Sequence, residues 1–97
     1  MADTFLLALQ DDLLLGLESS LVGLFIADDA GRVMDEAKDA CESNARKAVL
    51  AGDGTDADAV VAWESQRDGG EYGVTADGNF AYRVFPVGAN DTAGHVA

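Results

Sequence analysis

The first quarter of the chain is dominated by leucines that recur every three or four residues. Such spacing places side chains along one face of a helix, and Asp3 or Thr4 can cap its first turn. The pattern therefore predicts an amphipathic helix over residues 3–21. Further leucines widen its apolar stripe beyond what one packing surface needs. We expect the helix to contact its own domain and a second copy of the chain, although an ordinary core helix is the alternative. The expected dimer contacts are Leu6, Leu9, Leu13, Leu14, Leu17 and Leu21.

A strand pair and two helices are predicted in the middle of the chain. Residues 22–27 form an apolar run of strand length, and the aspartates and glycine of residues 28–31 suit a turn. Residues 32–35 then return as a short second strand. The apolar period changes to that of a helix over residues 36–51, where Gly52 is a natural terminator.

The face of this first middle helix is made of small apolar residues: Ala37, Cys41, Ala45, Ala48 and, beside them, Val49. A second helix is predicted from Thr55, whose spacing to Asp58 resembles a capping box, to about residue 67.

The last third of the chain has the pattern of antiparallel strands. Residues 71–75 alternate weakly, and residues 80–87 are rich in strand-forming side chains. Between them, Asp77-Gly78 is a strong hairpin signal. Pro86 suggests an edge position or a bulge, and residues 95–97 read as the start of another strand. The fold class expected from these elements is α+β: a five-stranded antiparallel sheet, helices on one face, and the extra N-terminal helix.

Three segments resemble the PAS family of domains. GLFIADDAGRV is similar to the first PAS hairpin, and DGNFAYRVFPVGANDTAGHVA is similar to the PAS ending. NARKAVLAGDGTD resembles the flavin-loop segment of the light-oxygen-voltage branch, in which Ala45 occupies the position of the photoactive cysteine. The resemblance implies two parts, an N-terminal helix over residues 1–21 and a PAS-like domain over residues 22–97, shortened in its last strand. It suggests a degenerate domain of a salt-adapted archaeal signalling protein, which cannot form the thiol–flavin bond.

The resemblance also implies where a ligand would bind. By position it assigns cofactor contacts to Asn44 and Arg46, and it implies a cavity between sheet and helices. We expect no resident cofactor, with FMN or another flavin as the alternative. The aromatic and apolar residues expected around the cavity are Phe25, Val33, Trp63, Phe80, Tyr82 and Phe85.

The charge of the chain narrows its partners. Eighteen acidic residues against six basic ones give a net charge of −12, with the acids spread through every segment. Such a chain repels nucleic acids and anionic membranes, because neither offers it a counter-charge. Solubility, a basic partner, and adaptation to a salt-filled cytoplasm each account for the excess, and we favour the last.

Catalytic chemistry finds little support in the residue inventory, and the chain is not expected to be an enzyme. Cys41 is the only cysteine and His95 the only histidine. The neighbours Asp39 and Glu42 would raise the pKa of the Cys41 thiol, the opposite of what a nucleophile requires. We expect Cys41 to pack as a small apolar side chain. No metal site is expected.

The function that these observations favour is a cytoplasmic sensory or dimerisation module of a signal-transduction or transcription-regulatory protein. It would act as a homodimer and pass its signal to an output domain outside this chain, such as a kinase, a transducer or a DNA-binding domain. Two alternatives stay open: a flavin-binding redox or light sensor that forms no adduct, and a purely structural dimerisation domain.

The acid excess generates a test. If it is an adaptation to salt, the melting temperature should rise markedly from low to molar KCl, because counterions screen the repulsion among the carboxylates. Thermal unfolding followed by circular dichroism measures this. A flat response would leave the acidity as a matter of solubility.

Overall fold

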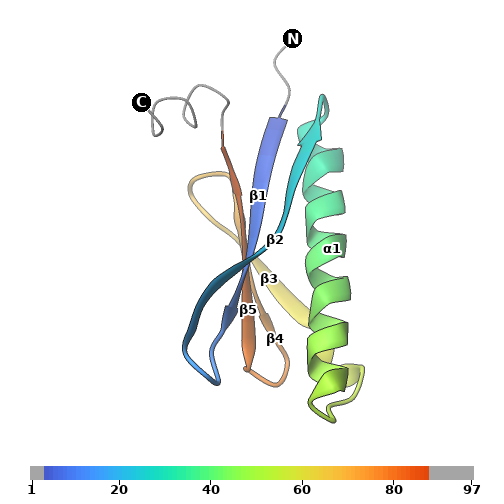
Figure 1. Cartoon of the computed structure of the whole chain (residues 1–97). Helices are drawn as coiled ribbons and strands as arrows, with labels where there is room; N and C mark the ends of the chain where they lie inside the picture. Colours follow the sequence, from blue (N-terminus) through green and yellow to red (C-terminus); the bar gives the residue numbers. More distant parts are fainter. Residues whose placement is uncertain (1–3, 88–97) are drawn as a thin grey trace.

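The computed structural model is a two-layer α+β arrangement of one antiparallel sheet and one long helix (Figure 1). It describes residues 4–87, with only the backbone described at Leu17 and Glu18. The elements in chain order are β1 (Thr4–Asp12), β2 (Leu17–Ala27), α1 (Ala30–Ala51), the short 3₁₀ turn η1 (Ala57–Ala59), β3 (Val61–Ser65), β4 (Glu71–Thr75) and β5 (Phe80–Pro86). The predicted five-stranded antiparallel sheet with helical structure on one face is confirmed.

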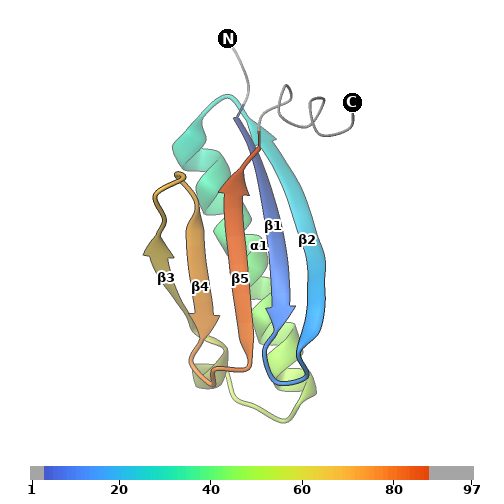
Figure 2. The same cartoon turned by 90° about the vertical axis from the view of Figure 1, so that its left-hand side faces the viewer.

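The strands lie side by side in the order β2-β1-β5-β4-β3. The first and last strands of the described chain are therefore neighbours at the centre of the sheet, where Leu6 is opposite Pro86 and Asp12 is opposite Phe80. Helix α1 lies across the face formed by β2, β1 and β5. In Figure 2 the sheet lies in front of α1, and no helix of the described residues lies over the face of the sheet that is turned toward the viewer.

The predicted N-terminal helix is wrong: residues 4–27 form the β1–β2 hairpin. Leucines at spacings of three and four also satisfy a strand when both of its faces are apolar, so the period alone is ambiguous. Asp12 decides where the chain reverses. Its backbone carbonyl accepts a hydrogen bond from the Gly16 amide at 2.9 Å and its Oδ1 accepts one from the Leu15 amide at 2.9 Å. Gly16 has φ +65°, a conformation that glycine adopts without strain.

The six leucines expected to form one helical dimer stripe are consequently divided. Leu6 is buried in the core, Leu9 and Leu21 are paired across β1 and β2, and Leu13 and Leu14 lie in the turn. Leu17 begins β2, so the expected domain boundary after residue 21 falls inside a strand.

Helix α1 begins at Ala30, six residues earlier than predicted, and the second strand predicted over residues 32–35 is wrong. Asp29 caps the helix: its Oδ1 accepts a hydrogen bond from the Arg32 amide at 3.1 Å. The predicted end at Gly52 is confirmed. The buried face has a strict spacing of four, Val33, Ala37, Cys41, Ala45 and Val49. Because most of these side chains are small, the helix axis can lie close to the sheet.

The second predicted helix is also wrong. The capping box exists, with the Thr55 amide donating to Asp58 Oδ2 at 3.0 Å and the Asp58 amide donating to Thr55 Oγ1 at 3.4 Å. Only the single turn η1 follows it, because residues 61–65 form the edge strand β3. The β-branched residues before Trp63 favour a strand. Trp63 is paired with Gly73 of β4, and its ring packs over that glycine.

The two C-terminal strands are confirmed, as is the Asp-Gly turn between them, where Gly78 has φ +75°. The edge position inferred from Pro86 is wrong, because β5 lies between β1 and β4. Pro86 is accommodated because the pairing with β4 ends at Val84, two residues before it. The strand expected at residues 95–97 lies outside the described residues. Within residues 4–87, no helix is long and apolar enough to cross a lipid bilayer.

The approach of β3 to β4 depends on a missing side chain. A Cβ added to Gly73 would lie 2.5 Å from Val61 Cγ1 and 2.7 Å from Trp63 Cε3. Gly73→Ala should therefore lower the free energy of unfolding by about 1–3 kcal/mol, the usual cost of overpacking. Urea unfolding followed by the fluorescence of Trp63, the only tryptophan, measures the loss.

Gly31→Ala is the matched control. A Cβ at Gly31, in the first turn of α1, meets only Asp29 Oδ1 at 3.4 Å. The change should leave stability unchanged or raise it by up to about 1 kcal/mol, the helix preference of alanine over glycine. Equal stability of the two variants would contradict the packing described at Gly73.

Candidate functional site

Core side chains occupy the space in which a ligand cavity was expected. Val33 and Tyr82 are completely buried, and Phe25, Trp63 and Phe80 pack, partly buried, against the same cluster. Phe85, the sixth residue expected there, lies on the opposite face of the sheet. The residues expected around a cavity therefore mostly fill the core between α1 and the sheet.

A chain of three polar side chains crosses the interface between α1 and the sheet. The Tyr82 hydroxyl donates a hydrogen bond to Asn44 Oδ1 at 2.7 Å and accepts one from Gln10 Nε2 at 3.1 Å. These two hydrogen bonds link α1 to β1 and β5. Burial raises the pKa of Tyr82 to about 12, against the lowering effect of the Gln10 hydrogen bond. Asn44, which the resemblance assigns to a cofactor, thus uses its carbonyl oxygen inside the fold.

Arg46 is not brought together with Asn44. It lies on the exposed side of α1, with Nε 4.0 Å from Asp56 Oδ1. The surface hollow beside it, of about 160 Å³, is also lined by Glu42. Two carboxylates therefore neighbour the guanidinium that the resemblance would place on a flavin phosphate.

Cys41 packs as predicted, with no exposed surface beneath α1. Burial, together with the negative charge of Glu42, raises the pKa of its thiol to about 12. The thiol is protonated at neutral pH and is enclosed by apolar neighbours. Within residues 4–87, no three His, Cys, Asp or Glu side chains gather closely enough to hold a metal ion.

Within the described residues, no helix covers the sheet face turned away from α1, here called the outer face (Figure 2). Successive side chains of a strand point to opposite faces of the sheet, so the residues that alternate with the buried ones lie on the outer face. Leu21, Leu24 and Ile26 of β2 are 68%, 54% and 52% exposed. The outer face consists of Phe5, Leu7, Leu9, Asp11, Ser19, Leu21, Leu24, Ile26, Ala62, Glu64, Tyr72, Val74, Ala81, Arg83 and Phe85.

The outer face is nearly free of the acid excess. Of the side chains that the structure describes there, only Asp11 and Glu64 are acidic and only Arg83 is basic, which gives a net charge of −1 (+1 − 2). The other acidic side chains that the structure describes lie on loops, on the helix or on the inner face. A strongly acidic protein thus keeps one broad surface that is apolar and close to neutral.

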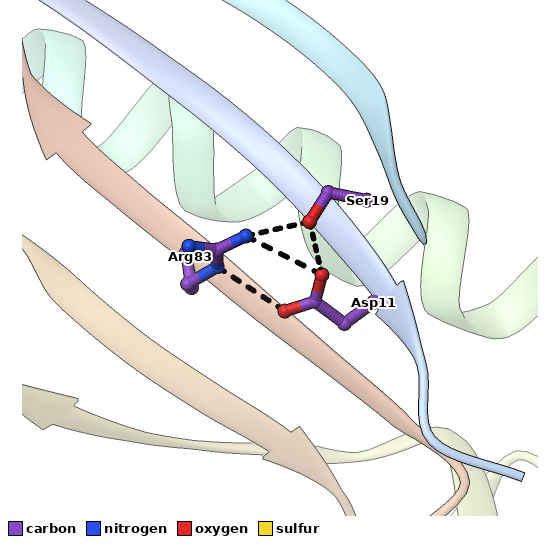
Figure 3. A network of polar contacts seen from close by, with 3 residues as sticks. All are labelled: Asp11, Ser19 and Arg83. Carbon is purple, nitrogen blue, oxygen red and sulfur yellow. Dashed lines mark hydrogen bonds and ion pairs between the residues drawn. The ribbon is translucent and has the colours of Figure 1, made fainter. Parts of the chain in front are cut away.

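A polar network joins β2, β1 and β5 on this face (Figure 3). Arg83 Nε donates to Asp11 Oδ2 at 3.1 Å, and Arg83 Nη2 donates to Asp11 Oδ1 at 3.4 Å and to Ser19 Oγ at 2.6 Å. The Ser19 hydroxyl donates in turn to Asp11. This two-bond fork holds the charges against each other, so the centre of the outer face presents a neutral pair.

Sequence reasoning missed the outer face because it assigned residues 3–21 to a helix. The available signal was the apolar character of consecutive residues in FLLAL and in GLFIA, which fits a strand that meets apolar surroundings on both faces. No family model, no curated protein and no solved structure matches the chain.

The buried tyrosine and cysteine predict loss of stability at alkaline pH. Their ordinary pKa values are 10.0 and 9.0, and both pKa values are raised to about 12 in the folded chain. The unfolded chain therefore releases protons above pH 9 that the folded chain retains. This stability is complete below pH 9 and is lost as pH rises toward 12.

Tyr82→Phe should make the decline between pH 9 and 12 shallower, because it removes one of the two groups. It should also lower stability at neutral pH by about 1–2 kcal/mol, since Asn44 and Gln10 lose their partner. Urea unfolding at a series of pH values measures both effects. Tyr72→Phe, at the only other tyrosine, is the matched control. Equal flattening by the two variants would contradict the role assigned to the burial of Tyr82.

Proposed function

We propose that the chain is a dimerisation module of a cytoplasmic signal-transduction protein, and that two copies associate through their outer faces. The observation that carries the proposal is the sheet face opposite α1, on which leucine and isoleucine side chains are more than half exposed. Exposed apolar surface of this extent marks interaction sites in soluble proteins.

The extent of the face suits a pair of protein chains. Five strands spaced about 4.8 Å apart, each with about seven residues rising 3.3 Å, give a patch of roughly 19 by 23 Å in projection. Side-chain relief raises the accessible area above this projection, toward the roughly 800 Å² per partner of a stable interface. The exposed turn leucines Leu13, Leu14 and Leu15 extend the apolar surface at one end of β1.

The charge distribution favours a second copy as the occupant. Two chains that each carry −12 repel one another, so they can associate only where the acids are few. The outer face meets this condition, since Arg83 already neutralises Asp11 at its centre. In a two-fold symmetric pair each face meets its own equivalent, and Arg83 of one copy would lie near Asp11 of the other. High salt would screen the repulsion between the remaining surfaces.

The residues that follow β5 are a poorer match for this surface. Residues 88–97 read GANDTAGHVA and contain a single large aliphatic residue, Val96. A segment of this composition offers little apolar area to cover rows of leucine, isoleucine and phenylalanine.

The PAS-like assignment remains part of the proposal. It is supported by the order of elements, in which a strand pair, a helical segment and three antiparallel strands follow one another. The module would act as a sensor by shifting between two packings of the dimer, and an output domain outside this chain would read the shift. We propose no resident flavin, because Asn44 is hydrogen-bonded to Tyr82 and Arg46 neighbours two carboxylates. We also propose no enzymatic activity.

Leu24→Glu should convert the dimer into a monomer, because it places a charge opposite an apolar surface that must lose its water. We expect the dimer dissociation constant of this variant to be at least about 100-fold larger than that of the unaltered chain. This corresponds to a loss of roughly 3 kcal/mol in the free energy of association. Sedimentation equilibrium in 0.2 and 2 M KCl measures the constant.

Leu50→Glu is the matched control. Leu50 lies on α1 and is 46% exposed, close to the 54% of Leu24, but it is remote from the outer face. This variant should dimerise like the unaltered chain. A monomeric unaltered chain at both salt concentrations, or equal effects of the two substitutions, would refute the proposal.

A further inference from the structure

One end of the outer face is hollowed beside the turn between β3 and β4. The hollow measures about 650 Å³, within the usual range for small-molecule sites. It is bounded by Arg67 and Asp68 of the turn and by side chains of β4 and β5. Nothing in the proposed dimer requires such a depression at the edge of the sheet.

The turn lies against β5 because Gly70 has no side chain. A Cβ at Gly70 would lie 2.3 Å from the Val84 carbonyl oxygen and 3.0 Å from Phe85 Cα. The turn reverses at Gly69, whose φ is +87°. This close approach brings Arg67 to the same hollow as Phe85.

Aromatic rings line one part of the hollow. Tyr72 of β4 is directly opposite Arg83 of β5, and Phe85 lies two residues further along β5 on the same face. Both rings are half-buried and border the hollow. They offer flat apolar surface on which another ring can stack or pack edge to face.

Most charged groups around the hollow already have polar partners within the fold. Asp68 Oδ1 accepts a hydrogen bond from the Gly70 amide at 2.8 Å. Glu71 accepts one from Ser65 Oγ at 3.1 Å and lies 3.5 Å from Lys38 Nζ. Arg83 is held by Asp11.

Arg67 differs from these neighbours. It is exposed, and among the side chains that the structure describes no carboxylate lies within ion-pair distance of it. In a chain with three acids for each base, an arginine at a hollow with no acidic partner is the group most available to an external anion.

We propose that this hollow binds a small aromatic monocarboxylate, with its ring against Tyr72 and Phe85 and its carboxylate on the Arg67 guanidinium. A single negative charge fits, because one cation is free and the paired Asp68 and Glu71 disfavour a multiply charged ligand. The site is separate from the core, which lies on the other face of the sheet and contains the buried Tyr82. The hollow shares Tyr72, Arg83 and Phe85 with the outer face, so a ligand bound there would compete with the proposed dimer for this part of the surface.

The test is a titration of the full ¹⁵N-labelled chain with phenylacetate, followed by ¹H–¹⁵N correlation spectra at constant KCl. Phenylacetamide serves as the neutral analogue and acetate as the anion without a ring. We expect saturable shifts around residues 66–72 and 83–85 with phenylacetate, and weaker binding of both analogues. Equal responses to phenylacetate and acetate, or shifts that lie elsewhere, would overturn the proposal.

Arg67→Gln should weaken the binding of phenylacetate about five- to tenfold and leave phenylacetamide nearly unchanged, as expected for loss of one partly exposed charged contact. Lys47→Gln, which removes an equally positive and exposed side chain from α1, is the matched control and should change neither affinity. Equal effects of the two substitutions would show only a general influence of charge and would refute the site.

Leu24→Glu separates this proposal from the proposed dimer. Phenylacetate should bind this variant at least as tightly as it binds the unaltered chain, because a monomer leaves Tyr72 and Phe85 uncovered. Loss of binding in a folded, monomeric Leu24→Glu chain would overturn the ligand site and leave the proposed dimer standing.

Discussion

The pairing of β1 with β5 is the interaction on which the rest of the structure depends. It joins strands about seventy positions apart in the chain and unites the β1–β2 hairpin with the β3–β4–β5 meander in one sheet. Leu6 and Ala8 of β1 and Tyr82 and Val84 of β5 form the buried surface that receives α1. Closing so long a loop costs conformational entropy, which only the burial of this shared surface can offset.

Helix α1 packs on that surface through a stripe of small residues and is joined to it by one polar connection. The alanines and Cys41 let the helix lie close to the strands, and the chain from Gln10 through Tyr82 to Asn44 satisfies the polar atoms enclosed between them. A buried hydroxyl with two partners tolerates little sliding of the helix, because any other register leaves polar atoms unpaired. The same close packing fills the core with the side chains of α1 and the sheet.

A single helix covers a single face, and this has consequences for the proposed function. The outer face keeps exposed apolar side chains, while most of the acidic side chains that the structure describes lie elsewhere. The Asp11–Arg83 pair keeps the centre of that face neutral, and the hollow at its edge leaves Arg67 accessible. Association and ligand binding would thus use the part of the surface where a second acidic chain or an anion meets the least repulsion.

The sequence by itself determined the features that depend on near neighbours in the chain. The apolar face of α1 from Ala37 to Val49, its end at Gly52, the Asp77-Gly78 turn and the strands on either side follow from local periodicity and from backbone preferences. Only the tertiary structure decided the state of residues 4–21, because leucines that fit both a helix and a two-sided strand are resolved by their partners in space. Leu9 meets Leu21 and Arg83 across neighbouring strands, and the spacing of the leucines alone does not distinguish these contacts from a helical stripe. The outer face and its hollow could not be predicted from the sequence for the same reason, because they form only when distant strands come together in one sheet.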